Sequence, residues 1–128
     1  MRQIAIHASD GRVVCRRCAV ADGPLTRMRG LLGRSTLDAD EGLLLKPAGS
    51  VHTFFMRFPI DAVFLGRPAA DGTRRVVAVH ANLRPWTGVV WYARGADSCL
   101  ELPAGTAAAS ATAVGDAISM APEPAAGD

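Results

Sequence analysis

The 128-residue chain lacks the features that mark secreted and membrane-spanning proteins. It has only three cysteines, and an odd count in a short chain argues against a secreted disulfide scaffold. No run approaches the roughly 20 apolar residues of a membrane span. The first ten residues hold no apolar stretch long enough for a signal peptide. We therefore expect a cytoplasmic protein with no membrane partner, provided that the native start does not lie upstream.

The chain also lacks a strong charge of one sign. Fourteen basic and twelve acidic residues give a net charge of +2, and the basic residues form no long run. This balance argues against a nucleic-acid partner. Lys46 is the only lysine, so the other basic residues are all arginines. The arginine fork suits carboxylate or phosphate, which makes some of them candidates for anion binding, although codon bias explains the same composition.

Repeats and common catalytic motifs are missing as well. No period recurs, which excludes collagen-like, coiled-coil and solenoid architectures. The chain has no phosphate-cradling glycine motif, no G-x-S-x-G and no H-E-x-x-H, so serine-nucleophile and zinc-protease chemistry have no support. The length and a hydrophobic content of 49% fit one globular domain. We place a single β-rich domain at residues 1–120 and a disordered tail at 121–128.

Short hydrophobic runs separated by turn dipeptides predict a mainly β fold. Asp10-Gly11 predicts a hairpin over residues 2–20, and Asp71-Gly72 predicts a second one. Pro24 opens the one clear helix, since proline is tolerated at the first helical position. Further strand-like runs are at 43–45, 51–66 (broken by Pro59), 74–80, 98–102 and 117–120, and a weak helical turn is at 104–113. We expect an α+β chain of seven or eight short strands and one short helix in its N-terminal half, arranged as a compact β-sandwich or small barrel.

The stretch VHTFFMRFPIDAVFLG at 51–66 carries the first candidate site. On an alternating strand, His52 shares one face with Phe54 and Met56. Histidine titrates near neutral pH and serves as a catalytic base or a metal ligand. A polar head beside two large apolar side chains fits the lip of a pocket, and it fits a satisfied core histidine equally well.

Two carboxylates lie in strongly apolar surroundings. Asp61 stands between Ile60 and Ala62, and Glu101 stands between two leucines. A carboxylate placed so should be paired, hydrogen-bonded or shifted in pKa. We expect Arg29 and Arg34 of the helix to be the partners. The cluster is then either a buried network that fixes the helix to the sheet or a ligand or catalytic site.

An aromatic loop is the next candidate. The long segment 81–95 contains Trp86, Trp91 and Tyr92, with arginines nearby. Such a loop can stack on sugars, bases or a partner protein. The alternative is that one tryptophan caps the open end of the sheet.

Cys15 and Cys18 form a C-x-x-C motif, which can be redox-active or half of a zinc site. The pair lies in a predicted strand, where residues three apart point to opposite faces. A zinc site would need two further ligands, and only Cys99 and scattered histidines are available. We therefore assign no metal and no cofactor, and interpret these cysteines as buried or incidental.

Several segments together resemble a known family. The segments are RMRGLLGR (27–34), EGLLL (41–45), HTFFMRFPIDAVFL (52–65), the turn Leu83–Trp86, LELPAG (100–105) and Val114–Asp116. In this order they are similar to the domain of unknown function 192 family of bacterial and archaeal proteins, in a subgroup with a His-Thr-x-x-Met segment. The resemblance implies a compact β-rich sandwich or barrel with a short helix near its start, and no assigned activity. Where many members carry an Asn-Thr pair, this chain has Arg57-Phe58-Pro59, so a site built on that asparagine is not carried over.

These observations support three hypotheses. The leading one is a small soluble binding or accessory domain whose cleft holds a small polar or anionic ligand or a partner peptide. The expected cleft residues are Arg29, His52, Met56, Asp61 and Trp86. The second is a hydrolase or lyase in which His52 is the general base and Asp61 or Glu101 orients it. The third is a purely structural subunit that docks onto a protein partner through the aromatic loop at 84–94.

Overall fold

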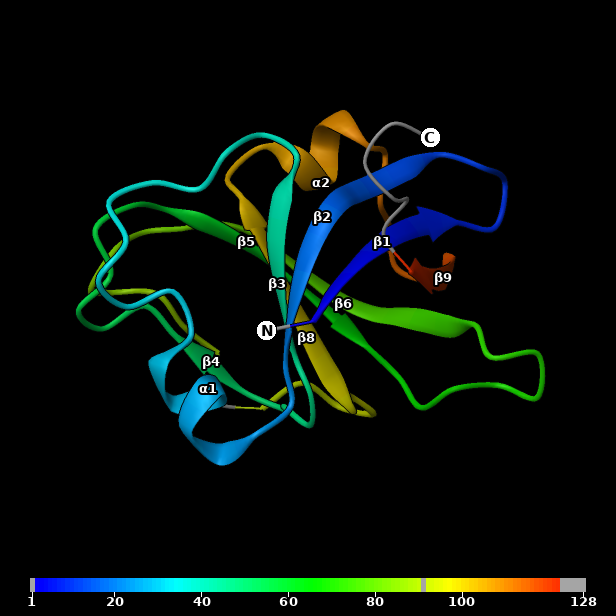
Figure 1. Cartoon of the computed structure of the whole chain (residues 1–128), viewed down its shortest axis with the longest axis horizontal. Helices are drawn as coiled ribbons and strands as arrows, with labels where there is room; N and C mark the ends of the chain where they lie inside the picture. The colour runs from blue at the N-terminus through cyan, green and yellow to red at the C-terminus, as the bar shows by residue number, and fades with distance from the viewer. Residues whose placement is uncertain (1, 91, 123–128) are drawn as a thin grey trace.

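The computed structural model describes residues 2–90 and 92–122. Its main body is a closed barrel with the strand order β1-β2-β3-β8-β5-β6-β9 (Figure 1). The barrel strands are β1 (Gln3–Ala8), β2 (Val13–Ala21), β3 (Glu41–Leu45), β5 (Ile60–Leu65), β6 (Arg74–Leu83), β8 (Ser98–Pro103) and β9 (Ala117–Pro122). Two short strands, β4 (Val51–His52) and β7 (Val89–Val90), form a separate sheet, and the helices are α1 (Pro24–Arg29) and α2 (Thr106–Ala109). The prediction of a mainly β chain in a small barrel is confirmed.

The strand boundaries refine the expectations from sequence. The hairpins β1–β2 and β5–β6 form antiparallel pairs, and α1 begins at Pro24. The segment 81–95 is less of a loop than expected, because β6 continues to Leu83 and β7 lies within it. At the C-terminal end, Ala121 pairs with Ala5, so the barrel extends past the boundary at residue 120. The rest of the expected tail, residues 123–128, lies outside the described residues.

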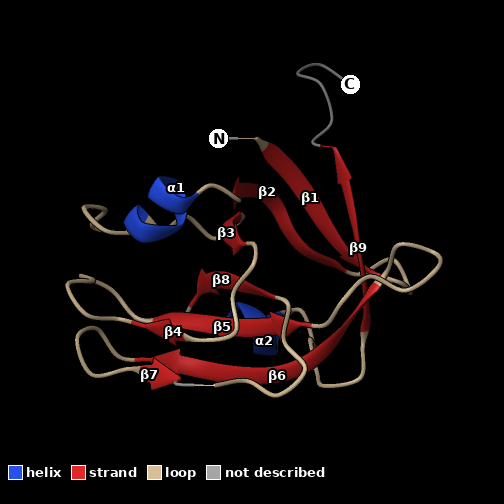
Figure 2. Cartoon of the chain, turned by 90° about the horizontal axis from the view of Figure 1, so that it is seen from below, coloured by secondary structure: helices blue, strands red, loops and turns tan. Residues whose placement is uncertain are grey.

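One pair of neighbouring strands is parallel, and this places α1. Strands β2 and β3 run in the same direction, with Cys18 opposite Gly42 and Val20 opposite Leu44. Parallel neighbours cannot be joined by a tight hairpin and need a longer crossover connection. The crossover at residues 22–40 contains α1, which lies outside the barrel on the same side as β4 and β7 (Figure 2).

Strand β5 separates two hydrophobic cores. All six of its residues are buried, which matches the unbroken apolar run in the sequence. Val63 and Leu65 face the barrel interior, and Phe64 faces a second core that the crossover, β4 and β7 cover. The neighbouring strands divide in the same way: Leu44 joins the first core and Leu43 the second.

A β-bulge changes the direction of the cysteines in β2. Cys18 lies opposite Ile4 and Cys15 lies opposite Ile6, so two residues of β2 face the single residue between these partners on β1. The extra residue rotates the strand, and both cysteines join the core inside the barrel. The expectation that they point to opposite faces is wrong, because it assumed a strand without a bulge.

Asp61 is a structural residue that fastens the end of the barrel. Its side chain is fully buried. The two carboxylate oxygens accept backbone N–H groups of Asn82 (2.8 Å), Gly105 (3.0 Å) and Ala107 (2.9 Å). The carboxylate therefore ties β5 to the end of β6 and to the start of α2. The expected partners, Arg29 and Arg34, make no contact of this kind with it.

We expect Asp61→Ala to lower the free energy of unfolding by about 3 kcal/mol, because three backbone donors lose a charged acceptor in a largely dry site. Urea denaturation at pH 7 measures the loss. The control is Asp71→Ala, since Asp71 accepts hydrogen bonds from Thr73 in an exposed turn. Equal losses in the two variants would contradict the role given to Asp61.

Candidate functional site

A cleft of about 120 Å³ lies between the crossover segment, the β4 region and the outer face of the barrel. Its lining includes Arg29 of α1, His52 of β4 and Glu101 of β8. Met56, from the segment between β4 and β5, lines it as well. Arg29 and His52 are exposed, whereas Met56 and Glu101 are buried. The cleft therefore has charged and polar groups at its mouth and a carboxyl at its floor.

Glu101 owes its place to the register of the barrel. It pairs with Leu43 of β3 on one side and with Ala62 of β5 on the other, and both neighbours belong to the second core. Only 5% of Glu101 is exposed, and its carboxyl makes no hydrogen bond or ion pair within residues 2–90 and 92–122. Burial raises the pKa of Glu101 to about 7.

His52 is held at the cleft by the chain that follows it. Its Nδ1 accepts the backbone N–H of Phe54 at 3.3 Å, and its ring stacks on the Phe54 ring with centroids 4.9 Å apart. Because Nδ1 accepts, the neutral imidazole carries its proton on Nε2. His52 thus offers one N–H donor toward other groups.

The expectation that the stretch 51–66 forms a strand up to its break at Pro59 is wrong, since β4 ends at His52. The chain turns after this residue: Thr53 and Met56 are buried, and the side chain of Phe55 is 66% exposed. The turn is closed by the bond from the Met56 N–H to the Thr53 carbonyl oxygen at 3.1 Å. A buried threonine hydroxyl fixes the turn in place of strand pairing.

Thr53 joins this turn to the segment that carries Trp86. The N–H of Trp86 donates to the Thr53 carbonyl oxygen at 2.8 Å, and the N–H of Gly88 donates to the Thr53 hydroxyl at 2.8 Å. The hydroxyl in turn donates to the carbonyl oxygen of Arg84. A Cβ on Gly88 would lie 2.9 Å from the same hydroxyl, so only glycine fits there.

The structure brings together four of the predicted site residues and separates two. Arg29, His52, Met56 and Glu101 line the cleft. Asp61 is occupied by backbone donors elsewhere. Trp86 does not line the cleft, and its ring lies against Phe55 with centroids 4.6 Å apart.

The other candidate residues lie away from the cleft or away from their expected partners. Arg34 pairs with Glu41 at 3.1 Å rather than with either buried carboxylate. The two histidines other than His52 are His7 and His80, and these are half-buried and do not line the cleft. Trp91 lies outside the described residues. Within the described ranges, no group of three or more histidine, cysteine, aspartate or glutamate side chains is arranged to hold a metal ion.

Sequence reasoning missed several parts of the cleft. Leu31, Leu45 and Val51 form apolar wall between the polar groups. Their hydrophobic character was visible in the sequence, but no local pattern shows that a helix turn, β3 and β4 meet at one point. The place of Glu101 between two leucines did predict a carboxyl in apolar surroundings, but no local pattern shows that it borders this cleft.

The fold and this cleft define a class: small, closed β-barrel domains with a crossover helix and a cleft between that helix and the outer face of the barrel. The model of the domain of unknown function 192 family, described as "Uncharacterized ACR", matches residues 5–120. The chain therefore belongs to this family. Neither helix in the described part of the chain is long and apolar enough to cross a membrane.

Two solved structures share the fold. A protein of unknown function from Novosphingobium aromaticivorans DSM 12444 is 24% identical, with a TM-score of 0.75 over 91% of this chain and 83% of that protein. A "putative transcription regulator" from Sinorhizobium meliloti 1021 is 25% identical, with a TM-score of 0.74 over 93% of this chain and 92% of that one. No curated protein matches the chain.

The Glu101 pKa of about 7 predicts a pH-dependent stability. In the unfolded chain the carboxyl has its ordinary pKa near 4.5. Between these values the folded chain keeps a proton that the unfolded chain loses, so the stability falls as the pH rises from 4.5 through 7. Glu101→Gln removes this term. From pH 4.5 to pH 8, we expect the free energy of unfolding of the variant to rise by about 3 kcal/mol relative to that of the wild type, as measured by urea denaturation.

Glu41→Gln is the matched control, because the Arg34 side chain lowers the pKa of Glu41. Its pH term has the opposite sign: the stabilisation by Glu41 is present at higher pH and is lost as the pH falls. A Glu101→Gln curve that runs parallel to the wild-type curve would show that this carboxyl is not held in a dry site.

Proposed function

We propose that the protein is a binding module whose cleft holds a small ligand with an anionic group and a hydrogen-bonding group. The observation that carries this proposal is the carboxyl of Glu101, a residue that is only 5% exposed, makes no side-chain hydrogen bond among the described residues and borders an open cleft. Burying such a group without a partner is costly, so a ligand that supplies the missing bond would be stabilised there.

Each polar residue of the cleft suits one part of such a ligand. The exposed guanidinium of Arg29 can donate two parallel hydrogen bonds to a carboxylate or phosphate. The Nε2–H of His52 can donate to an oxygen of the ligand. Glu101 can donate when protonated and accept when ionised, and a pKa of about 7 makes both forms available near neutral pH.

The size of the cleft favours a small ligand. Its volume of about 120 Å³ is well below the roughly 300–1,000 Å³ of sites for drug-sized molecules. A hydroxy acid, an amino acid or a similar small anion is therefore a better fit than a nucleotide. Met56 and Leu45 supply apolar surface for a short carbon chain.

The enzyme hypothesis has weaker support. Both oxygens of Asp61 are occupied by backbone donors, and no hydrogen bond or ion pair joins His52 to Glu101 within the described ranges. A general base needs an orienting partner within hydrogen-bond reach. The shared cleft keeps a His52–Glu101 acid–base pair as an alternative that a bound substrate could assemble.

Docking of a protein partner is a second candidate, and the Phe55–Trp86 pair favours it. Phe55 is 66% exposed and Trp86 is 53% exposed. Both have positive φ angles, 66° and 69°, a strained conformation for aromatic residues. Thr53 holds this arrangement, so the fold presents two aromatic rings at a cost in backbone strain. Exposed aromatic pairs of this kind are common anchors in protein interfaces.

We also propose that the protein works in the cytoplasm. The support is chemical: Cys15, Cys18 and Cys99 are all free thiols in the structure. Free thiols persist in reducing compartments and become oxidised in secretory ones.

The ligand proposal is tested by a thermal-shift screen of small carboxylates, amino acids and phosphates. A ligand present at about 100 times its dissociation constant adds roughly 2.7 kcal/mol, which raises the Tm of a domain of this size by several degrees. We expect a compound that stabilises the wild type, loses its effect in Arg29→Ala and is weakened in Glu101→Gln.

The control is Arg67→Ala, which removes an exposed arginine from the β5–β6 connection and should leave the shift unchanged. A shift that survives in both cleft variants would place the binding elsewhere. A screen with no stabilising compound would contradict the ligand proposal and favour the docking of a partner through Phe55 and Trp86.

A further inference from the structure

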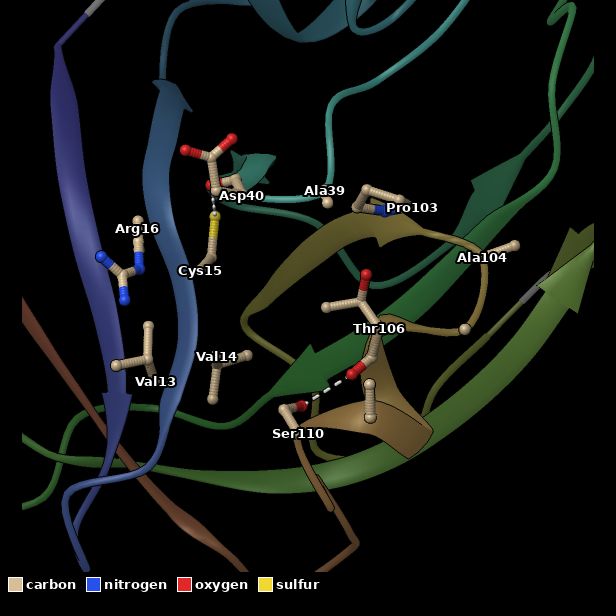
Figure 3. Close-up of a pocket in the computed structure, with 12 residues that line it drawn as sticks. Val13, Val14, Cys15, Arg16, Ala39, Asp40, Pro103, Ala104, Thr106 and Ser110 are labelled. Atoms are coloured by element: carbon tan, nitrogen blue, oxygen red, sulfur yellow. Dashed lines mark hydrogen bonds between the residues drawn. The ribbon is translucent and has the colours of Figure 1, made fainter.

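A second cavity, larger than the cleft, opens beside strand β2. Its volume is about 490 Å³, and it shares no lining residue with the cleft. Figure 3 shows it between β2 and the segment that carries α2. Cys15, Asp40, Pro103, Thr106 and Ser110 are among the residues that line it. The cavity therefore contains one member of the C-x-x-C motif.

The bulge in β2 gives the two cysteines a common environment. Cys15 and Cys18 both turn into the barrel core, whereas Arg16 between them is exposed. In Figure 3 the Cys15 side chain lies on the side of β2 that faces Asp40 and Pro103, and Arg16 turns away. Cys15 lines the cavity with 2% of its surface exposed, whereas Cys18 is fully buried and does not line it.

The sulfur of Cys15 occupies space that is free because β3 has a glycine, Gly42, beside it. A Cβ on Gly42 would lie 2.8 Å from this sulfur and 3.2 Å from the Glu101 carbonyl oxygen. Any larger residue at position 42 would displace the thiol. The sulfur donates to the backbone carbonyl oxygen of Asp40 at 3.6 Å, the bond drawn in Figure 3.

The surroundings of the three thiols shift their pKa values in different directions. The pKa of Cys15 is lowered, first by hydrogen bonding with the Cys18 side chain and then by the backbone N–H of Arg17, against the opposing effects of burial and the Asp40 carboxylate. The same pairing and burial raise the pKa of Cys18. Burial raises the pKa of Cys99 well above its ordinary value. The thiolate is the nucleophilic form of cysteine. Cys15 is both the thiol whose pKa is lowered and the one that lines the cavity.

We propose that Cys15, with Cys18 as its positioning residue, is a reactive thiol site that exchanges with low-molecular-weight disulfides entering this cavity. The Cys15 thiol loses its proton to water, and the thiolate attacks one sulfur of a disulfide RSSR. The new bond joins Cys15 to SR, the old S–S bond breaks, and the released RS⁻ takes up a proton. The net reaction converts Cys15–SH and RSSR into Cys15–S–SR and RSH, and free thiol reverses it.

The test exposes the folded full-length chain to hydroxyethyl disulfide near pH 7.5 and follows each cysteine by peptide mass mapping. We expect Cys15 to acquire the mixed disulfide at least about tenfold faster than Cys99, the buried internal control. The adduct should disappear when a reducing thiol is added. In guanidinium chloride the three cysteines should react at similar rates, because the differences belong to the fold.

Three variants separate this site from general opening of the barrel. Cys15→Ser should abolish the fast reaction. Cys18→Ser should slow the reaction at Cys15 and move its rate profile to higher pH, an effect that a merely structural role would not produce. Thr106→Phe narrows the cavity without touching either thiol and should slow Cys15 alone. A circular dichroism spectrum checks that each variant is folded.

The outcomes are decisive in either direction. A fast adduct at Cys15 that a reducing thiol removes supports the proposal. Equal rates at Cys15 and Cys99, or a fast phase that survives in Cys15→Ser, would overturn it. Unchanged kinetics in Thr106→Phe would overturn entry through the cavity.

Discussion

The burial of strand β5 on both of its faces organises the whole molecule. One face of β5 packs Val63 and Leu65 into the barrel interior, and the other packs Phe64 into the second core beneath the crossover segment and β4. Because both faces of β5 are apolar, each face must pack against another part of the chain. The crossover between the parallel strands β2 and β3 covers the outer face. The cleft exists because this cover does not close completely over the barrel. The outer wall of the barrel therefore forms the floor of the cleft, and the crossover segment and β4 form its mouth.

Two buried carboxylates show how the same sequence signal leads to different roles. Asp61 and Glu101 both stand in apolar runs, and they lie on adjacent paired strands. Asp61 reaches the end of the barrel, where three backbone N–H groups surround it, so it stabilises the fold. Glu101 faces the second core, where β3 and β5 offer only Leu43 and Ala62 beside it. Among the described residues no side chain or backbone group makes a hydrogen bond or ion pair with its carboxyl, and burial raises its pKa to about 7.

Local irregularity in the strands creates both candidate sites. The bulge in β2 turns Cys15 toward the larger cavity, and the early end of β4 at His52 frees the next residues to form a turn. Thr53 then holds Phe55 and Trp86 in positive-φ conformations that a regular strand would exclude. Regular strand pairing forms the barrel, and the irregularities in that pairing position the Cys15 thiol and the Phe55 and Trp86 rings.

The sequence by itself determined the fold class, both hairpins, the start of α1 at Pro24 and the family, because these depend on local periodicity, turn residues and ordered motifs. It also identified His52, Arg29, Met56 and Glu101 as candidates. Only the tertiary structure decided which of these meet, that Asp61 and Trp86 are excluded, and that Cys15 and Cys18 share one side of β2. The physical reason is that strand register, a one-residue bulge and the path of a crossover each reorient side chains by contacts between distant segments, and no local pattern records those contacts.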